Sequence, residues 1–471
     1  MNFKKISMYL CFVYIILCFM FYFIAGDQLK YTDSEALPKP VEASDPIGEI
    51  VKGNDVYQAF RPTGDALTSI SLKFATYNRK NSGDIQVKLI DDNKDELYDV
   101  SINKRDIKDN EFYKITFDKP ITLKNTDEVA ILISSYSSDK SQAVTIWYNN
   151  KVQGDKLKVA NIEKEGMLCF TYESKNISLI GEYYFVICAI LLFILLVYIA
   201  ISSKRYKAGK NTALIALVST YTKYKFLLNQ LVLRDFKSKY KRSILGILWS
   251  FLNPLLTMIV QYVVFANLFK FNIDNFAVYL LSGIVFFNFF SEATTLAMTS
   301  ITGNSTLINK VYVPKYIFPI SRVISSVINL VLSIIPLILV MVFTGCKFTP
   351  AILLLPYGII CLILFSIGIS FILSSLMVFF RDTQFIWSVL TMIWMYLTPI
   401  IYPESILTKS ILYIVKLNPL YHFIGFIRTI LLQGVSPEPI SYLICGAYAA
   451  VVFFIGAYIF KRSQDKFIIK L

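Results

Sequence analysis

Charged residues are scarce in this sequence, and histidine is almost missing. Only 17% of the 471 residues are Asp, Glu, Lys or Arg, whereas a soluble globular protein carries about 25%. Hydrophobic residues make up 55% and the mean hydropathy is +0.54. These values argue against a fully soluble protein. Because His422 is the one histidine, multi-histidine metal centres are excluded and serine–histidine chemistry is disfavoured.

Cysteine is nearly absent from the polar part of the chain. Of seven cysteines, only Cys169 lies in residues 26–178, so no disulfide framework holds that block together and it must fold on its own core. The block holds 25 of the 33 acidic and 21 of the 47 basic residues. The rest of the chain is hydrophobic and strongly basic. This distribution favours cytoplasmic flanks of membrane spans over nucleic-acid binding.

Motifs that bind nucleotides or carry out catalysis are also missing. No G-x-x-x-x-G-K-[ST] loop occurs, and the fragment AGKNT at 208–212 lacks the first glycine and the Ser/Thr. No paired acidic motif of a glycosyltransferase lies among the basic loops, where only Asp235, Asp382 and Asp465 are available. We expect no cofactor, no metal and no enzymatic activity. If transport is powered, the ATPase is a separate chain.

Long apolar runs are what the sequence has instead. Residues 1–25 form an N-terminal transmembrane anchor, since the run 6–25 is long enough to span. A cleaved signal peptide is the alternative, but Phe23 breaks the expected A-x-A site. A second span covers 179–202. Six more spans form the core, 244–471, at 244–268, 276–299, 317–343, 350–379, 385–403 and 438–460. The Lys/Arg pattern predicts cytoplasmic termini and an external 26–178.

Residues 26–178 show the alternation of short β-strands. Ile70, Leu72 and Phe74 alternate with polar or small residues, and the same pattern recurs to the end of the block. Regular short strands predict a β-sandwich or jelly roll. If the apolar faces form the core, Tyr77 on the strand 69–77 and Trp147 on 143–149 are exposed aromatics. Such a surface suits a glycan-binding platform, and a spacer or partner-docking domain is the alternative.

Residues 203–243 are basic and amphipathic. The segment mixes apolar and basic residues at helical spacing, which predicts a helix on the cytoplasmic membrane face. Two charges, Glu292 and Arg322, fall inside or at the ends of core spans, where charge is costly. They form either a polar conduit or conformational latch, or they reach the interface near the span ends.

The segment LVLRDFKSKYKRSILGILWSFLNP contains a basic R-D-x-K-x-x-Y-x-x-S box, followed by L-G-x-x-W and N-P. This order is similar to the opening of the membrane permeases of ABC-type polysaccharide, O-antigen and teichoic-acid exporters, which residues 231–465 resemble. Further matches follow in order: GNSTLINKVYVPKYIFPIS (303–321), FFRDTQ (379–384), TPIIYPES (398–405) and LNPLYHFIGFIRTILLQG (417–434). The anchor, the β-domain and the second span depart from the family, whose members mostly begin near the amphipathic helix.

The resemblance implies partners and roles. Such permeases pair as homodimers and dock two copies of an ABC ATPase. Residues 300–316 would be the coupling helix, with contacts at Asn304, Leu307, Asn309 and Lys310. Residues 203–243 would be the gate helix, and five cations would recruit a lipid-linked pyrophosphate: Arg234, Lys237, Lys239, Lys241 and Arg242. Anchoring to anionic lipid is the alternative for this cluster. Residues 403–434 would form short re-entrant helices near the exit, with His422 structural.

Aromatic residues crowd the core spans. Their faces suit sugar rings, so we expect a sugar-lined channel, although contacts with lipid or neighbouring helices are the alternative for any single ring. The candidates are Trp249, Phe251, Tyr262, Phe286, Phe290, Trp394 and Tyr396.

The sequence therefore predicts an α-helical polytopic protein of a bacterial cytoplasmic membrane, with two N-terminal spans, a six-span permease core and an inserted external β-sandwich or jelly roll. We expect it to export a polyprenyl-lipid-linked polysaccharide or teichoic acid. The alternatives are an ABC exporter of a lipid or drug, and a membrane-anchored glycan-binding or polymerisation-regulating protein.

Overall fold

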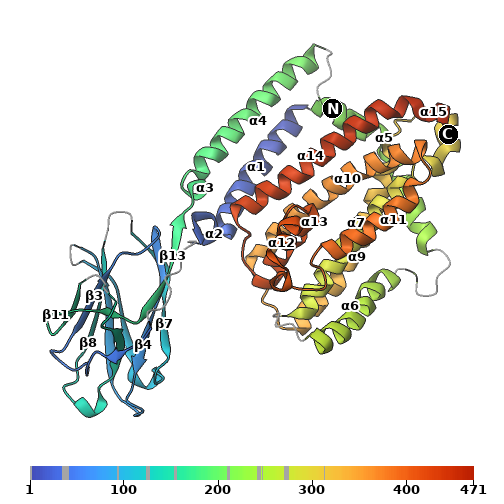
Figure 1. Ribbon diagram of the computed structural model, residues 1–471. Coiled ribbons are helices and arrows are strands. Elements are labelled where there is room, and N and C mark those ends of the chain that lie inside the picture. The colour runs from blue at the N-terminus through green and yellow to red at the C-terminus, as the bar shows by residue number, and fades with distance from the viewer. Residues whose placement is uncertain are drawn as a thin grey trace. The chain divides into compact units, whose positions relative to one another are not determined.

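The chain forms two compact units in a computed structural model (Figure 1). One unit is Leu29–Tyr184, and the other combines Met1–Gln28 with Phe185–Leu471. The structure describes residues 3–33, 42–92, 95–123, 128–152, 156–208, 213–240, 246, 248–269, 275–311 and 313–470.

The smaller unit contains two antiparallel sheets. One has the order β1-β13-β4-β9-β12, with β7 also paired to β4 and β2 to β9. Its strands are β1 (Tyr31–Asp33), β2 (Asp45–Pro46), β4 (Ala66–Ala75), β7 (Phe112–Thr122), β9 (Thr145–Asn149), β12 (Met167–Leu168) and β13 (Phe170–Ile177). The other has the order β11-β10-β3-β8-β5-β6. Its strands are β3 (Val56–Phe60), β5 (Asp84–Ile90), β6 (Glu96–Asn103), β8 (Val129–Ser135), β10 (Leu157–Val159) and β11 (Ile162–Lys164).

A single apolar core joins the two sheets. Ile70, Leu72 and Phe74 of β4 are buried against residues such as Ile131 and Ile133 of β8. Burying each of these side chains contributes about 1.5–3 kcal/mol, which explains how the unit holds together without disulfides. The alternation predicted for β4 is confirmed.

One strand boundary was predicted wrongly. Strand β4 ends at Ala75, and Tyr77 lies beyond it in a left-handed turn with φ of 56°. The Thr76 backbone N–H donates to Asp109 Oδ1 at 2.5 Å instead of continuing the ladder. Tyr77 is 40% exposed all the same.

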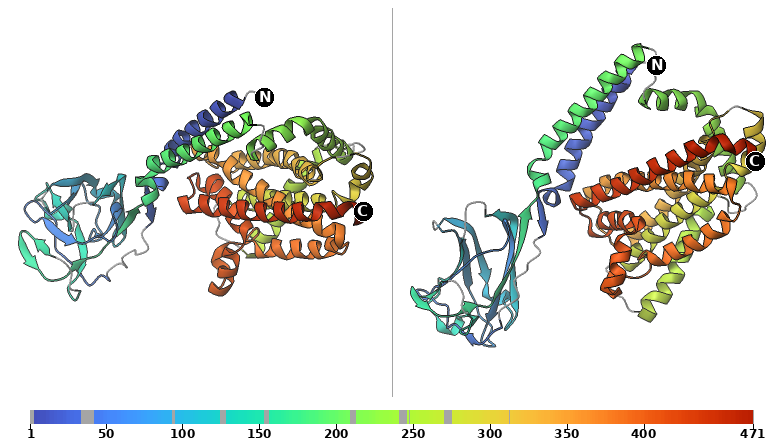
Figure 2. Two further views of the ribbon diagram at one scale, coloured as in Figure 1. Left: turned by 90° about the horizontal axis from the view of Figure 1, so that it is seen from above. Right: turned by 45° about the horizontal axis from the view of Figure 1, so that its top comes forward.

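The larger unit is helical. Within the described residues, seven of its helices are long and apolar enough to cross a membrane. They are α1 (Phe3–Ala25), α4 (Tyr184–Lys207), α6 (Leu248–Phe269), α7 (Phe276–Met298), α9 (Ile317–Phe343), α10 (Leu355–Phe379) and α14 (Pro439–Ser463). The predicted multi-pass membrane protein is confirmed. Helices α1 and α4 run side by side (Figure 2), where the Tyr14 hydroxyl donates to the Cys188 carbonyl at 2.9 Å.

The predicted count of two plus six spans depends on two shorter segments. Helix α11 (Thr383–Leu397) has 15 residues, about 22 Å at 1.5 Å per residue, which is shorter than a hydrocarbon core of about 30 Å. Residues Lys409–Lys416 and Pro419–Gln433 form a pair bent by 90°, the shape of a broken span or re-entrant loop. The pair contains α12 (Lys409–Lys416) and α13 (Pro419–Arg428).

The remaining helices are short, apart from α5 (Ala213–Tyr240), which carries the basic segment. The short α-helices are α2 (Asp27–Lys30), α3 (Leu179–Glu182), α8 (Ser305–Lys310) and α15 (Phe467–Lys470). The 3₁₀ and π turns are η1 (Lys104–Asp106), η2 (Lys140–Gln142), η3 (Thr302–Asn304), η4 (Pro350–Leu354), η5 (Glu404–Ile406), η6 (Thr429–Gln433) and η7 (Gln464–Lys466).

Helix α7 lies at the centre of the larger unit. Its span is 72% buried, against 6% for the α1 and α4 spans. Helices α9 and α10 pack against it, and α14 packs against α10. The α10–α14 contact is backbone on backbone, because a Cβ added to Gly456 would lie 2.2 Å from the carbonyl oxygen of Gly368.

Candidate functional site

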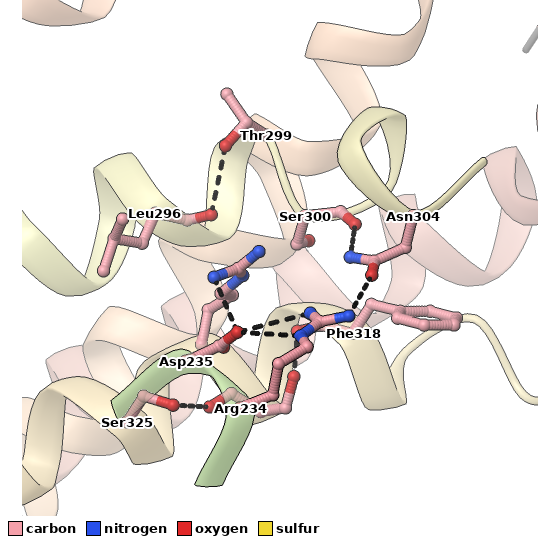
Figure 3. Close-up of polar contacts among 10 residues, drawn as sticks. Arg234, Asp235, Leu296, Thr299, Ser300, Asn304, Phe318 and Ser325 are labelled. Carbon is pink, nitrogen blue, oxygen red and sulfur yellow. Dashed lines mark hydrogen bonds and ion pairs between the residues drawn. The ribbon is translucent and has the colours of Figure 1, made fainter. Parts of the chain in front are cut away.

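A polar network joins the basic end of α5 to α9. Arg322 on α9 forms an ion pair with Asp235 on α5, with 3.0 Å between Arg322 Nη1 and Asp235 Oδ1. Arg234 Nη2 reaches the same carboxylate oxygen at 3.2 Å (Figure 3). The Asp235 side chain is only 9% exposed, and its Oδ2 is buried with no hydrogen-bond partner among the described residues. Two cations therefore share one buried anion.

The same arginine connects α5 to the segment that precedes α8. Arg234 Nη1 donates to Asn304 Oδ1 at 3.2 Å, and Asn304 Nδ2 donates to the Ser300 carbonyl at 2.7 Å (Figure 3). Asn304 is buried. Its amide oxygen and its amide nitrogen each have a hydrogen-bond partner, so burial leaves neither group unsatisfied. Arg234 therefore links α5 to the segment before α8 through Asn304.

Helix α8 presents two of the predicted coupling residues to the outside. Asn309 and Lys310 are exposed, Leu307 is half-buried, and Ile308 is buried. Leu307 packs at the edge of a small apolar cluster that includes Ile308 and Phe318. The structure therefore separates the four predicted residues: Asn304 and Leu307 face the protein, while Asn309 and Lys310 are available to a partner.

A second ion pair attaches α5 to α7. Lys239 Nζ lies 2.7 Å from Glu292 Oε1, and Asn329 Nδ2 on α9 donates to the same oxygen at 2.7 Å. Glu292 is thus neutralised by α5 and oriented by α9. Both core charges singled out in the sequence, Glu292 and Arg322, are thus paired with residues of α5.

A cavity of about 480 Å³ lies among these groups. Three cations line it, Arg234, Lys239 and Arg322, against two carboxylates. Since Arg234 is half-exposed, the cavity offers an incoming anion charge-assisted hydrogen bonds. Of the other predicted recruitment residues, Lys237 is exposed outside this lining, and Lys241 and Arg242 lie outside the described residues.

The seven predicted channel aromatics divide into two groups. Phe286 and Phe290 on α7 are fully buried, and Phe290 packs edge-on against Trp394, 5.2 Å between ring centroids. The Trp394 indole N–H donates a hydrogen bond to Asn418 Oδ1 at 2.6 Å. Trp249, Tyr262 and Tyr396 are exposed, and Phe251 is half-buried. Of the second group, Tyr262 also contacts the ring of Phe276, 5.8 Å between centroids.

On the β-unit, the register brings further aromatic residues to the outer face of one sheet. Phe74 opposes Ile146, which places Lys73 beside Trp147, and Lys73 opposes Phe112 on the other side. The Trp147 indole N–H donates to Asn110 Oδ1 at 2.8 Å, which fixes the ring across the sheet. Asn110 follows Asp109, the residue that holds the turn containing Tyr77. Trp147 itself is half-buried.

Sequence reasoning missed Arg428. This side chain is 9% exposed and donates to the backbone carbonyls of Pro399, Tyr279 and Ile400 at 2.6, 2.9 and 2.9 Å. The signal was present: an arginine inside an apolar stretch demands an internal partner. The partners are backbone carbonyls of distant segments, which the sequence does not reveal.

Comparison with known proteins gives a consistent result. Residues 227–432 match the family model of the ABC-2 type transporter. An O-antigen export system permease protein RfbA from Myxococcus xanthus is 30% identical over 259 residues, 54% of this chain and 98% of that protein. An RfbA from Klebsiella pneumoniae is 31% identical over 238 residues, 50% of this chain and 90% of its own length. The polysialic acid transport protein KpsM of Escherichia coli is 24% identical over 246 residues, which is 51% of this chain and 95% of that protein.

Proposed function

Given that the chain belongs to the ABC-2 type transporter family, we propose that it is the membrane-spanning subunit of an exporter that moves a lipid-linked polysaccharide across a bacterial cytoplasmic membrane. One observation carries the proposal: export permeases for O-antigen match this chain over nearly their whole length. The chain is a transport permease and not an enzyme. ATP hydrolysis takes place on a separate ABC ATPase.

The helical unit supports the division of labour between permease and ATPase. Two copies of the chain would form the passage, and two ATPase subunits would dock on the cytoplasmic side. The exposed ends of Asn309 and Lys310 on α8 suit that contact, while the inward Leu307 and Asn304 anchor the segment. Helix α8 has only six residues, so its two exposed residues form a small contact that the ATPase surface would extend.

The cavity beside α5 supports an anionic head group. A pyrophosphate entering it would meet Arg234, Lys239 and Arg322, and the exposed Lys237 of α5 would add a further cation. The alternative cargo is a lipid or drug without a glycan. Anionic membrane lipid would also be attracted to this surface, and it competes with the cargo in the test below.

Cargo recognition and coupling would use the same arginine. A phosphate oxygen on Arg234 competes with Asp235 and with Asn304, whose hydrogen bonds it replaces. Loss of the bond to Asn304 would leave the apolar cluster that Leu231 forms with Ile301 and Ile308 as the connection between α5 and the 300–310 segment. Arrival of cargo at the gate would therefore be sensed at the ATPase contact through one side chain.

The β-unit, with residues 26–178 outside the cell membrane, would bind the polymer after export. The outer row of Trp147, Lys73 and Phe112, next to Tyr77 and Asn110, supports this role, because aromatic faces stack on sugar rings and an amide bonds hydroxyls. The alternative is a spacer domain. The alternative function for the whole chain is that of a membrane-anchored regulator that works without an ATPase.

The first experiment reconstitutes the full chain with its ATPase in nanodiscs and measures ATP hydrolysis with and without lipid-linked glycan. We expect a stable complex and a several-fold stimulation by lipid-linked glycan, but none by the same lipid without sugar or by anionic phospholipid. Arg234→Gln should lose stimulation, whereas Arg381→Gln, a matched exposed arginine on a loop, should keep it. No complex, or hydrolysis by the chain alone, would refute the proposal.

A second experiment tests the β-unit. Trp147→Ala and Tyr77→Ala in the full chain should weaken binding of the exported polysaccharide, followed by co-sedimentation with proteoliposomes, and leave ATPase stimulation unchanged. Tyr136→Ala is the control, since Tyr136 is 75% exposed and bonds Gln86 on the other sheet. Equal binding by all three variants would favour the spacer.

A further inference from the structure

A second cavity lies in the helical unit, at the bent helix pair. Its volume is about 740 Å³, inside the usual range of about 300–1,000 Å³ for ligand pockets. Short pieces of chain close around it: the start of α7, the loop after α11, helix α13 and the start of α14. The lining residues that matter here are Tyr279, Glu404, Tyr421, His422, Arg428 and Gln433.

The polar side chains in this cavity are held in place by bonds within the protein. The Tyr421 hydroxyl donates to Glu404 Oε2 at 3.0 Å. His422 Nε2 lies 2.7 Å from the Lys416 carbonyl, and its ring stacks on Tyr448 with 5.6 Å between centroids. The carboxylate and the two rings are therefore pre-positioned.

Arg428 gives an independent reason to expect a ligand with oxygen atoms. It lines the cavity, and among the described residues it forms no ion pair, since all its hydrogen bonds go to backbone carbonyls. Its Nε is buried with no hydrogen-bond partner in the part of the chain that the structure describes. The Glu404 carboxylate lines the same cavity, so the lining carries both a cation and an acceptor, which suits a neutral ligand rich in hydroxyl groups.

We propose that this cavity is a saccharide-binding site that holds one or two sugar residues of the cargo on its way out. The proposal rests on the polysaccharide export argued above and assigns a site to it. Sugar hydroxyls both donate and accept, which matches Glu404, an acceptor, and Gln433, which does both. Tyr421 adds aromatic surface to the lining, which suits the C–H face of a pyranose, and His422, stacked on Tyr448, supports Tyr421 in a T-shaped contact.

A lipid tail does not fit this lining. An acyl chain would displace water from Glu404 and Gln433 without replacing its hydrogen bonds, which is unfavourable. Bound sugar would instead satisfy them. Because such contacts are individually weak and made by every sugar ring, the site would retain the polymer without stopping it.

The test needs no knowledge of the sugar. Gln433→Cys is introduced into the full chain, and its reaction with a membrane-permeant maleimide is followed by peptide mass spectrometry in cells whose ATPase partner is catalytically inactive, so that transport stalls. Cells that make the polysaccharide are compared with cells lacking its first glycosyltransferase. Gln433 is exposed at the cavity, so the thiol is reachable when the cavity is empty.

We expect labelling of Gln433→Cys to be at least threefold slower in polysaccharide-making cells. Lys409→Cys, on the exposed start of α12 and outside the cavity lining, should label equally in both. Adding Glu404→Gln should remove the protection. If Gln433→Cys blocks export, Thr429→Cys, also in the lining, takes its place.

Equal labelling in both cell types would overturn the saccharide site. That failure is distinguishable from failure of the export proposal. If the reconstituted complex is stimulated by lipid-linked glycan but the thiol is never protected, export stands and the site is wrong. If neither complex nor stimulation exists, the export proposal itself has failed.

Discussion

Arg428 and Tyr279 are stacked, with the guanidinium carbon 3.4 Å from the ring centroid. The same arginine bonds the carbonyl of Tyr279 and two carbonyls after α11. One buried cation thus connects α13, the start of α7 and the 399–400 loop. Removing it takes a charged donor from all three carbonyls, although Pro399 and Tyr279 keep hydroxyl donors from Tyr279 and Ser282.

We therefore expect Arg428→Ala to lower the free energy of unfolding by about 3 kcal/mol or more, since hydrogen bonds to charged groups are worth about 1.5–3 kcal/mol each. Arg428→Lys should recover little, because a lysine cannot reproduce the planar fork. The measurement is thermal unfolding of the purified chain in detergent, with Arg381→Ala as control. A lysine variant as stable as the original would contradict this explanation.

Gly283 makes room for that arginine. A Cβ at this position would lie 2.7 Å from Arg428 Nη2 and 2.9 Å from Ile400 Cγ2. Gly283→Ala should cost about 1–3 kcal/mol through overpacking. Gly425→Ala is the matched control, because nothing lies within 4 Å of its added Cβ and alanine favours a helix by about 1 kcal/mol. The two variants should therefore differ in the sign of their shift in unfolding temperature.

The shared carboxylate of Asp235 predicts non-additive effects. Asp235→Asn leaves two arginines facing each other, and Arg322→Gln leaves a buried anion with half its compensation. We expect each single variant to be less stable, and the double variant to be more stable than the sum predicts, with a coupling energy of about 1–3 kcal/mol. A double-mutant cycle on thermal unfolding measures it. Strict additivity would mean that the ion pair is absent in the membrane.

The buried and exposed aromatics should respond differently to truncation. Phe290→Ala removes a fully buried ring from the α7 core and should cost about 3–5 kcal/mol of stability. Trp249→Ala and Tyr396→Ala remove exposed rings and should leave unfolding nearly unchanged while slowing export. Unfolding temperature and surface polysaccharide are measured together. If the exposed variants export normally, those rings serve lipid contact and not cargo.

Acid should loosen the turn that carries Tyr77. Backbone N–H donors from 76–78 lower the pKa of Asp109, so its carboxylate stabilises the folded turn above its ordinary pKa of about 4 and loses this effect as pH falls through the lowered value. Asp109→Asn should lack the turn's extra stability at neutral pH and lose the acid dependence. Tryptophan fluorescence as a function of pH measures this change, since the Trp147 indole N–H donates a hydrogen bond to Asn110, which follows Asp109. Asp118→Asn, an exposed carboxylate, is the control.

Much of the architecture could be predicted because it follows from local pattern. Alternation fixes β4, and apolar length fixes α7 and α9. The motifs in 231–465 gave the family, and this prediction is confirmed. The boundary at Ala75 was missed because the competing bond comes from Asp109, more than thirty residues away.

The candidate site was less predictable, for the same reason. That Arg234 belongs to a basic surface is visible in sequence. Its bond to Asn304, seventy residues away, and the pairing of Lys239 with Glu292 depend on how α5, α7 and α9 pack. Hydropathy records that Phe290 is apolar but not that its ring is enclosed by Phe365 and Trp394.

The glycines of α10 and α14 have a mechanical consequence. Because the backbones touch at Gly368 and Gly456 with no side chain between them, these two helices cannot slide or roll past each other without a collision of main-chain atoms. We therefore expect α10 and α14 to move together as one rigid body. In the proposed dimer, any widening that admits a polymer would come from helices on the other side of α7 or from the interface between the two copies.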